Sequence, residues 1–279
     1  MRCAPDELAQ VAQLVEELCG IVLDETKAYL VESRLAGLVG SAGCQSYGEL
    51  VQLVRGGRDT ELRALLLDAI TTNETSFFRD GAPFQALRQD LLPELLERRA
   101  GGSGGRRLRI LSAASSTGQE ALSVAVLLAD LLGDELADWQ LEIVGADISG
   151  EALERAASGT YSEAEVGRGL SAVELSRYFT RVGTAWRVRP ELYRLLRFEQ
   201  RNLLEPLTGL GAFDLILCRN VSIYFRPEVR RDLYLRLARQ LLPGGYRIAG
   251  ASESLRELDP RFEPEVRRGA VVYRPSGRK

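Results

Sequence analysis

A polar loop that opens a helix follows an apolar run of strand length. The run Leu108–Leu111 precedes Ser112–Gly118 (SAASSTG), and a helical pattern continues from Gly118 to Leu132. The backbone N–H groups of such a loop, together with the amino end of the helix, favour an anionic or carboxylate-bearing ligand. The loop lacks the three glycines of G-x-G-x-x-G, so a dinucleotide is not expected. Ordinary capping of the helix by the loop's serines and threonine explains the pattern equally well.

An acidic residue, Asp147, follows the next apolar run, Leu141–Gly145. A carboxylate at the carboxyl end of a parallel strand can accept hydrogen bonds from both hydroxyls of a ribose. The alternative role of Asp147 is to cap the helix predicted from Gly150. Together with the preceding loop, Asp147 predicts a site for a nucleoside without a pyrophosphate, and S-adenosylmethionine fits that description.

Two further polar segments have residue types suited to ligand binding. Within Thr71–Asp80 (TTNETSFFRD), Arg79 is expected to seek a carboxylate, because a guanidinium pairs with that group through two parallel hydrogen bonds. Asn220 follows the apolar run Phe213–Cys218. Its amide can donate to and accept from a ligand, or it can cap the following turn, and the sequence favours neither role.

The composition narrows the classes of chemistry and of partner. The 279 residues include 36 Lys and Arg against 39 Asp and Glu, and the net charge of −3 gives no reason to expect nucleic acid or an anionic membrane as partner. The absence of histidine excludes imidazole catalysis, and the scattered cysteines form no metal-binding pattern, so no metal site is expected. Without a leader pattern or an apolar run of about 18 residues, we expect a soluble, cytoplasmic protein with no membrane insertion.

The apolar periodicity divides the chain into two regions that position these residues. Residues 1–80 are expected to form a helical domain, with helices predicted at 8–18, 26–39, 47–54 and 60–70. Residues 81–279 are expected to form an α/β domain, because short apolar runs alternate with helical stretches as in βαβ units on a parallel sheet. A β insertion is predicted at about 179–198, where the pattern is that of a hairpin. Other elements are expected as a helix at 83–99, a glycine-rich loop at 100–105, a turn at 243–245, a strand at 246–250 and a strand pair at 262–274.

Taken together, these segments resemble the chemotaxis receptor methyltransferase family, called CheR. The matching motifs follow the family's order along nearly the whole chain: TTNETSFFRD at 71–80, LSAASSTGQEALS at 111–123, GADIS at 145–149, NLL at 202–204, FDLILCRNVSIYF at 213–225 and LLPGG at 241–245. The resemblance implies an all-α N-terminal domain, then a Rossmann-like S-adenosylmethionine-dependent methyltransferase domain with a small antiparallel β subdomain. It also implies S-adenosylmethionine as cofactor and S-adenosylhomocysteine as product.

By the same resemblance, nine positions match the family's cofactor contacts: Asn73, Thr75, Arg79, Glu120, Asp147, Asn202, Leu203, Asn220 and Val221. We assign Asp147 to the ribose, Glu120 to the cofactor's ammonium group, and Arg79 to a carboxylate of the cofactor or the substrate. Asn202 and Asn220 are expected to flank the adenosyl and methyl-bearing portion.

The activity implied is methylation of glutamate side chains on the cytoplasmic domain of methyl-accepting chemotaxis receptors, in adaptation of chemosensory signalling. A glutamate, with a reference pKa of about 4.3, is ionised at neutral pH and needs no general base. Alignment of that carboxylate with the sulfonium can contribute about 7–11 kcal/mol in favourable cases. Arg79 and Tyr224 are the candidate catalytic residues, with Tyr224 either positioning the substrate carboxylate or only packing.

Departures from the family's pattern leave other functions open. The loop Gly118–Ser123 reads GQEALS where the family usually has GEEPYS, which supports an alternative as a catalytically weak signalling or scaffold protein. Leu38 replaces a frequent arginine, so Arg34 and Lys27 make a thinner basic patch toward a receptor. The hairpin around Gly183 is short, so we expect no tethering to a receptor's C-terminal pentapeptide. A further alternative is a methyltransferase for a different carboxylate acceptor.

Overall fold

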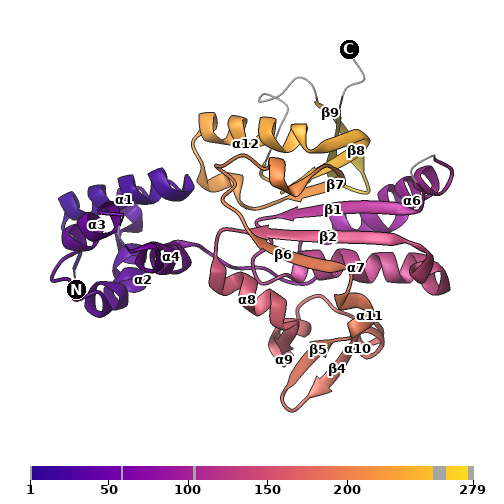
Figure 1. Ribbon diagram of the computed structural model, residues 1–279, viewed down its shortest axis with the longest axis horizontal. Coiled ribbons are helices and arrows are strands. Elements are labelled where there is room, and N and C mark those ends of the chain that lie inside the picture. The colour runs from indigo at the N-terminus through magenta and orange to yellow at the C-terminus, as the bar shows by residue number, and fades with distance from the viewer. Residues whose placement is uncertain (1, 58, 103–104, 254–261, 276–279) are drawn as a thin grey trace.

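The computed structural model describes residues 2–57, 59–102, 105–253 and 262–275. A cluster of helices from the N-terminal part of the chain lies at one end of the strands of a large sheet, and a small sheet lies beyond the β6 edge of the large one (Figure 1). The glycine-rich loop predicted at 100–105 falls partly outside the described residues. In the described part of the chain, no helix is both long and apolar enough to cross a membrane.

The helices predicted for the N-terminal region are confirmed. They are α1 (Pro5–Cys19), α2 (Ala28–Ser41), α3 (Tyr47–Arg55) and α4 (Thr60–Ile70), with the short 3₁₀ helix η1 (Glu25–Lys27) before α2. Helix α1 begins with Pro5 in its first turn and ends at Gly20, whose φ of 78° closes the helix with a left-handed residue. One face of each helix supplies a separate core that includes Val15, Leu35 and Leu66. The division of the chain near residue 80 stays a prediction.

The helix predicted at 83–99 contains a wide turn in its middle. It consists of α5 (Ala82–Ala86), the π-helical segment η2 (Leu87–Leu91) and α6 (Leu92–Ala100). Pro93 lies just after the π-helical segment. Because proline has no N–H to donate to the preceding turn, the regular α-helical ladder cannot continue through this position.

The large sheet has the Rossmann-like α/β arrangement expected from the sequence. Its order in the described part of the chain is β6-β2-β1-β7-β8-β10-β9. The first five of these strands are parallel, and β10 runs antiparallel to both β8 and β9. The strands are β1 (Arg107–Ala113), β2 (Gln140–Asp147), β6 (Leu196–Gln200), β7 (Phe213–Cys218), β8 (Leu241–Ala249), β9 (Phe262–Arg267) and β10 (Ala270–Pro275).

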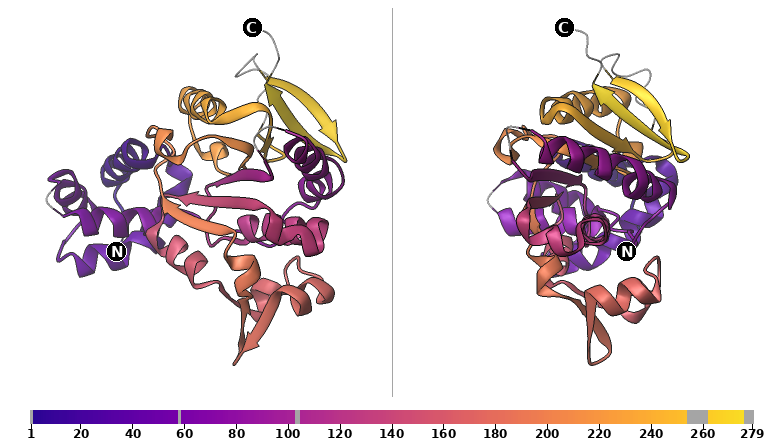
Figure 2. Two further views of the ribbon diagram at one scale, coloured as in Figure 1. Left: turned by 45° about the vertical axis from the view of Figure 1, so that its right-hand side comes forward. Right: turned by 90° about the vertical axis from the view of Figure 1, so that its right-hand side faces the viewer.

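Helices cover both faces of this sheet (Figure 2). Neighbouring strand residues alternate between the two cores: Ile110 joins the core under α7 (Gln119–Leu132) and α6, whereas Leu111 joins the core under α12 (Pro227–Arg239). Helix α8 (Gly150–Ser158) follows β2. The shorter 3₁₀ helices are η3 (Gly133–Asp138), η4 (Thr208–Leu210) and η5 (Ser222–Tyr224).

The predicted hairpin is confirmed, and a third strand joins it. In the described part of the chain the small sheet has the order β3-β5-β4, from β3 (Thr160–Ser162), β4 (Phe179–Val182) and β5 (Ala185–Val188). The short helices α9 (Glu163–Val166), α10 (Ala172–Tyr178) and α11 (Pro190–Tyr193) surround it. The β structure therefore begins before residue 179, while residues 196–198 belong to β6 of the large sheet. Phe77, from the segment before α5, packs edge-to-face on two residues of the small sheet. Its ring centroid lies 5.2 Å from that of Tyr161 and 5.7 Å from that of Phe179.

The turn predicted at 243–245 is wrong, because these residues lie within β8. The pairing with β7 shifts there, from Phe213 opposite Leu241 to Leu215 opposite Tyr246. The extra residues are accommodated as a bulge. A Cβ on Gly245 would lie 2.7 Å from the carbonyl oxygen of Asp214, so only glycine permits this close backbone approach.

Candidate functional site

The ten site residues expected from the sequence all line one cleft. They are Asn73, Thr75, Arg79, Glu120, Asp147, Asn202, Leu203, Asn220, Val221 and Tyr224. The cleft lies at the carboxyl ends of β1, β2 and β7, where the chain order reverses in the sheet and α/β proteins bind ligands. The cleft is open to solvent on one side, and its lining combines apolar side chains with a few polar groups, as in many small-molecule sites.

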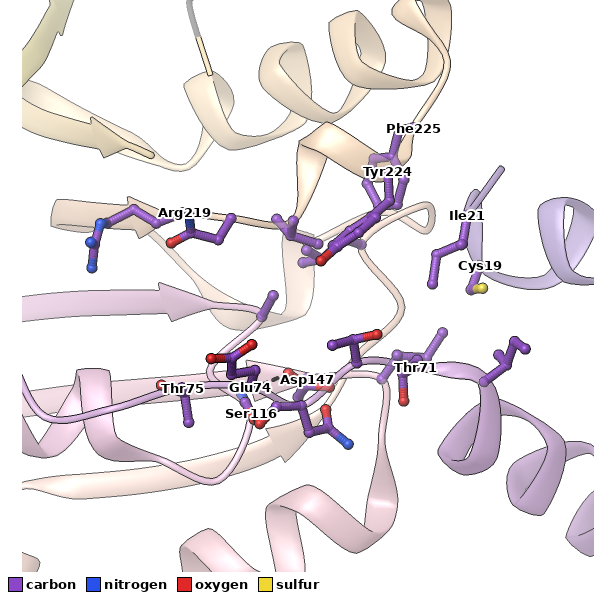
Figure 3. A pocket seen from close by; sticks show the side chains of 18 of the residues that line it. Cys19, Ile21, Thr71, Glu74, Thr75, Ser116, Asp147, Arg219, Tyr224 and Phe225 are labelled. Carbon is purple, nitrogen blue, oxygen red and sulfur yellow. Dashed lines mark hydrogen bonds between the residues drawn. The ribbon is translucent and has the colours of Figure 1, made fainter. Parts of the chain in front are cut away.

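Asp147 lies at the floor of the cleft (Figure 3). Its carboxylate accepts hydrogen bonds from the backbone N–H groups of Ser116 (2.7 Å) and Ser149 (2.9 Å). Burial raises the pKa of Asp147 above its ordinary value, and these backbone hydrogen bonds oppose part of the increase. The capping alternative is wrong, because the N-cap of α8 is Ser149, whose side chain accepts from the N–H of Ala152. Asp147 is thus fixed by the backbone around it while it lines the cleft.

Replacement of Asp147 by alanine is expected to weaken binding of S-adenosylhomocysteine by about 1–3 kcal/mol, the scale for hydrogen bonds lost at a buried polar site. Isothermal titration calorimetry measures the change. The matched control is Ser171→Ala, which removes the N-cap of α10 outside the cleft and should lower stability by about 0.5–2 kcal/mol while affinity is retained. Unchanged affinity in Asp147→Ala would exclude contact between this carboxylate and the ligand.

The loop after β1 presents backbone to the cleft. Ala114 (φ 60°), Ser116 (φ 51°) and Gly118 (φ 90°) all have left-handed conformations. Gly118 is the N-cap of α7 and no side chain caps this helix in the described part of the chain, so the capping role considered for the serines and threonine is wrong. The loop reaches the cleft at Ala114 and Ser116, whereas Gly118 and Gln119 at the start of α7 are buried and do not line it.

Glu120 is held by an arginine that sequence reasoning did not assign to the site. Arg219 Nη1 donates to Glu120 Oε2 (2.8 Å), and Ser112 Oγ donates to Glu120 Oε1 (2.8 Å). Arg219 Nη2 donates to the carbonyl of Arg79 and to Asp80 Oδ2, both at 2.8 Å. The side chain of Arg219 is 1% exposed. Arg219 thus joins the start of α7 to the 71–80 segment, and its only signal in the sequence is its place at the end of β7.

The 71–80 segment passes over the ends of β1 and β2 (Figure 3). The carbonyl of Asn73 accepts from Ser116 Oγ (2.9 Å), and Asn73 Nδ2 lies 3.4 Å from Ser149 Oγ. Arg79 is partly buried, and its Nη1 donates to the carbonyl of Glu74 (2.7 Å). These contacts leave the other guanidinium nitrogens of Arg79 for a ligand, as far as the described residues show.

The side chain of Asn202 forms a hydrogen bond between the sheet domain and the helical domain. Its Nδ2 donates to the carbonyl of Leu18 (2.8 Å), and its Oδ1 accepts from the N–H of Leu204 (3.0 Å). The side chain expected beside the adenosyl group thus has structural partners as well as a place in the cleft wall. Leu203 is buried beside it.

The remaining wall comes from the helical domain and the loop after β7. The N–H of Val22 donates to the carbonyl of Tyr224 (2.9 Å), and the Tyr224 hydroxyl points into the open space of the cleft (Figure 3). Arg34 donates to the carbonyls of Ile70 (2.8 Å) and Thr71 (3.1 Å), so it secures the end of α4. Of the basic pair expected to face a receptor, Arg34 is therefore engaged within the chain, and Lys27 lines the cleft.

Two family models and two relatives match most of the chain. The family model described as "CheR methyltransferase, SAM binding domain" matches residues 73–269, and "CheR methyltransferase, all-alpha domain" matches residues 6–71. The chain is 43% identical over 266 residues to chemotaxis protein methyltransferase 1 of Pseudomonas aeruginosa, covering 93% of this chain and 94% of the relative. It is 36% identical over 270 residues to the chemotaxis protein methyltransferase of Escherichia coli, covering 95% and 88%. A solved structure of the glycopeptide N-methyltransferase MtfA with S-adenosylmethionine has 16% identity and a TM-score of 0.34, covering 70% of this chain and 65% of that chain.

Proposed function

Because the chain belongs to the CheR methyltransferase family, we propose that it transfers the methyl group of S-adenosylmethionine to glutamate side chains on the cytoplasmic domain of chemotaxis receptors. The observation that carries the proposal is the joint placement of Asp147, Glu120 and Arg79 in one cleft at the switch point of the sheet. A cytoplasmic location follows from this proposal, because the acceptor domain is itself cytoplasmic.

The residues of the cleft suit S-adenosylmethionine group by group. Asp147 would accept the ribose hydroxyls, and Glu120, fixed by Arg219 and Ser112, would accept from the ammonium group. The guanidinium of Arg79 would pair with a carboxylate. Asn220 and Val221, with Asn202 and Leu203, would line the adenosyl portion.

When bound, the cofactor supplies an electrophilic methyl group on a sulfonium. The chain's task is to hold a carboxylate in line with that group, because an ionised glutamate needs no base. Tyr224 directs its hydroxyl into the cleft from the loop after β7 and is placed to donate to the acceptor carboxylate. Arg79 lines the same cleft. It attracts the acceptor carboxylate if it does not pair with the carboxylate of the cofactor.

Incubation of the protein with methyl-labelled cofactor and membranes from its own cell tests the proposal. Base-labile label on receptor bands is the expected result, because glutamyl esters hydrolyse in mild base. Label on another protein or on a small acid would identify a different carboxylate acceptor. Binding of S-adenosylhomocysteine without label anywhere would favour the signalling or scaffold alternative.

We further propose that receptor recognition does not use a C-terminal pentapeptide. The support is the shortness of the β4–β5 hairpin, in which only Gly183 and Thr184 join two four-residue strands. Receptor fragments with and without their last five residues should therefore be methylated at equal rates. A rate that falls when those residues are removed would contradict this proposal.

The affinity for S-adenosylhomocysteine is expected to fall when the pH is lowered. A ribose hydroxyl is best accepted by the ionised form of Asp147, and burial raises the pKa of that carboxyl. A raised pKa means that protonation begins at a higher pH than the value of about 3.9 for an ordinary aspartate. Calorimetry over a series of mildly acidic buffers measures the loss. Asp147→Asn, which does not titrate, should lose this dependence, and identical profiles for both proteins would contradict the assignment.

A further inference from the structure

A buried carboxylate outside the cleft holds the loop that forms one of its walls. Glu253 is 2% exposed and is absent from the residues that line the cleft. Its carboxylate accepts from the backbone N–H groups of Asn220 (2.7 Å), Val221 (3.1 Å), Ser222 (2.7 Å) and Gly250 (2.8 Å). It also accepts from Ser222 Oγ (2.7 Å). Both carboxylate oxygens are thus occupied by short, charge-assisted hydrogen bonds.

The loop has the backbone conformation of an anion-binding nest. Asn220 is left-handed, with a φ of 59°, and the next residue, Val221, is right-handed, with φ −119° and ψ −43°. Successive residues of opposite hand turn their N–H groups toward one point, where an anion binds. Asparagine adopts the left-handed region more often than most residues other than glycine, which suits Asn220 to this position. The carboxylate of Glu253 occupies the point on which these N–H groups converge.

Gly250 and Tyr234 lie next to the carboxylate of Glu253 and the loop that it binds. A Cβ on Gly250 would lie 2.5 Å from Glu253 Oε2 and 3.0 Å from the backbone nitrogen of Asn220, so no side chain fits at this position. The hydroxyls of Ser222 and Tyr234 lie 2.5 Å apart, which connects the loop to α12. The guanidinium of the fully buried Arg247 lies 3.9 Å from the centre of the Tyr234 ring and packs against it.

We propose that Glu253 is a positioning residue for methyl transfer. By filling the nest, its carboxylate fixes residues 220–222, so that Asn220, Val221 and the following Tyr224 face the cleft. Glu253 acts through this loop and touches neither the cofactor nor the acceptor. The inference rests on the proposed function, because the ligand of the loop is taken to be S-adenosylmethionine.

Two steps test this role of Glu253: its carboxylate is removed by substitution, and a free anion is then added to fill the nest. Glu253→Ala should bind S-adenosylhomocysteine about tenfold more weakly, the scale for lost hydrogen bonds to a charged group. Sodium formate should restore the affinity, because its carboxylate fits the vacated nest, whereas sodium chloride at the same ionic strength should not. Wild-type affinity in Glu253→Ala, or a loss that formate does not reverse in the folded variant, would overturn the proposal.

A second pair of variants decides the matter if Glu253→Ala does not fold. Glu253→Asp keeps an anion on a shorter side chain, and Glu253→Gln keeps the length but turns an NH₂ group toward backbone N–H donors. The aspartate variant should bind S-adenosylhomocysteine more tightly than the glutamine variant, and the reverse order would overturn the proposal. Failure of the unaltered protein to bind S-adenosylhomocysteine would instead refute the proposed function.

Discussion

Replacement of Arg219 by alanine is expected to lower the free energy of unfolding by about 3–5 kcal/mol, because it leaves buried charge without its partner. The side chain of Arg219 is 1% exposed and joins Glu120, itself 12% exposed, to Asp80. Without the guanidinium, the carboxylate of Glu120 keeps only the hydroxyl of Ser112 among its described partners. Urea denaturation followed by circular dichroism measures the loss, and calorimetry should show weaker binding of S-adenosylhomocysteine.

Arg106 provides a matched control for this prediction. It also lies between two carboxylates, those of Glu135 and Asp138, each at 3.2 Å, but its side chain is 44% exposed. Exposed ion pairs contribute only about 0–1 kcal/mol, so Arg106→Ala should leave stability and cofactor affinity nearly unchanged. If both variants lost the same free energy of unfolding, the prediction that burial strengthens the ion pairs of Arg219 would be wrong.

Replacement of Arg79 by alanine is expected to lower kcat about 100-fold or more, the scale for misplacing a reacting group by about 1 Å. Arg79 lines the cleft, and the one contact described for its side chain is to the carbonyl of Glu74. The fold should therefore remain intact. Initial rates with labelled cofactor and receptor fragment measure the effect, and a thermal melt verifies folding.

Two measurements on Arg79 separate its possible partners. If Arg79 pairs with the cofactor, Arg79→Ala should weaken binding of S-adenosylhomocysteine as well as turnover. If it pairs with the acceptor carboxylate, the affinity for S-adenosylhomocysteine should remain and turnover alone should fall. Arg79→Lys keeps the charge without the bidentate fork and should recover only part of the rate. Full activity in Arg79→Ala would remove this residue from the site.

Much of the fold could be predicted from local patterns. The helices at 5–19 and 60–70 have apolar residues at helical spacing and clear end signals, such as Gly20 and Asp59, whose side chain accepts from Leu62. The buried strands β1, β2 and β7 appear as short apolar runs followed by polar loops. Because the carboxyl ends of parallel strands meet at one edge, polar residues at these ends were expected in one place, and the cleft contains Ser116, Asp147 and Asn220.

The parts that sequence reasoning missed depend on contacts between distant segments. Arg219 and Glu120 are 99 residues apart, and Glu253 is more than 30 residues from the N–H groups of Asn220 and Val221. No periodicity marks such pairs. Strand β3 has only three residues, too few to show alternation, and exists because β5 supplies its hydrogen-bond partner. The glycines at 244 and 245 suggested a turn, but pairing with β7 overrides that local preference.

The hydrogen bond from Val22 to Tyr224 makes the helical domain a structural part of the reaction chamber. With Asn202 bound to Leu18, it joins the two domains at the wall of the cleft. Exchange of helical domains between relatives would therefore replace one side of that cleft, because Ile21, Leu23 and Lys27 of this domain line it. A substitution far from the sheet, within the helices, could then change the shape of the space in which the ligand is held.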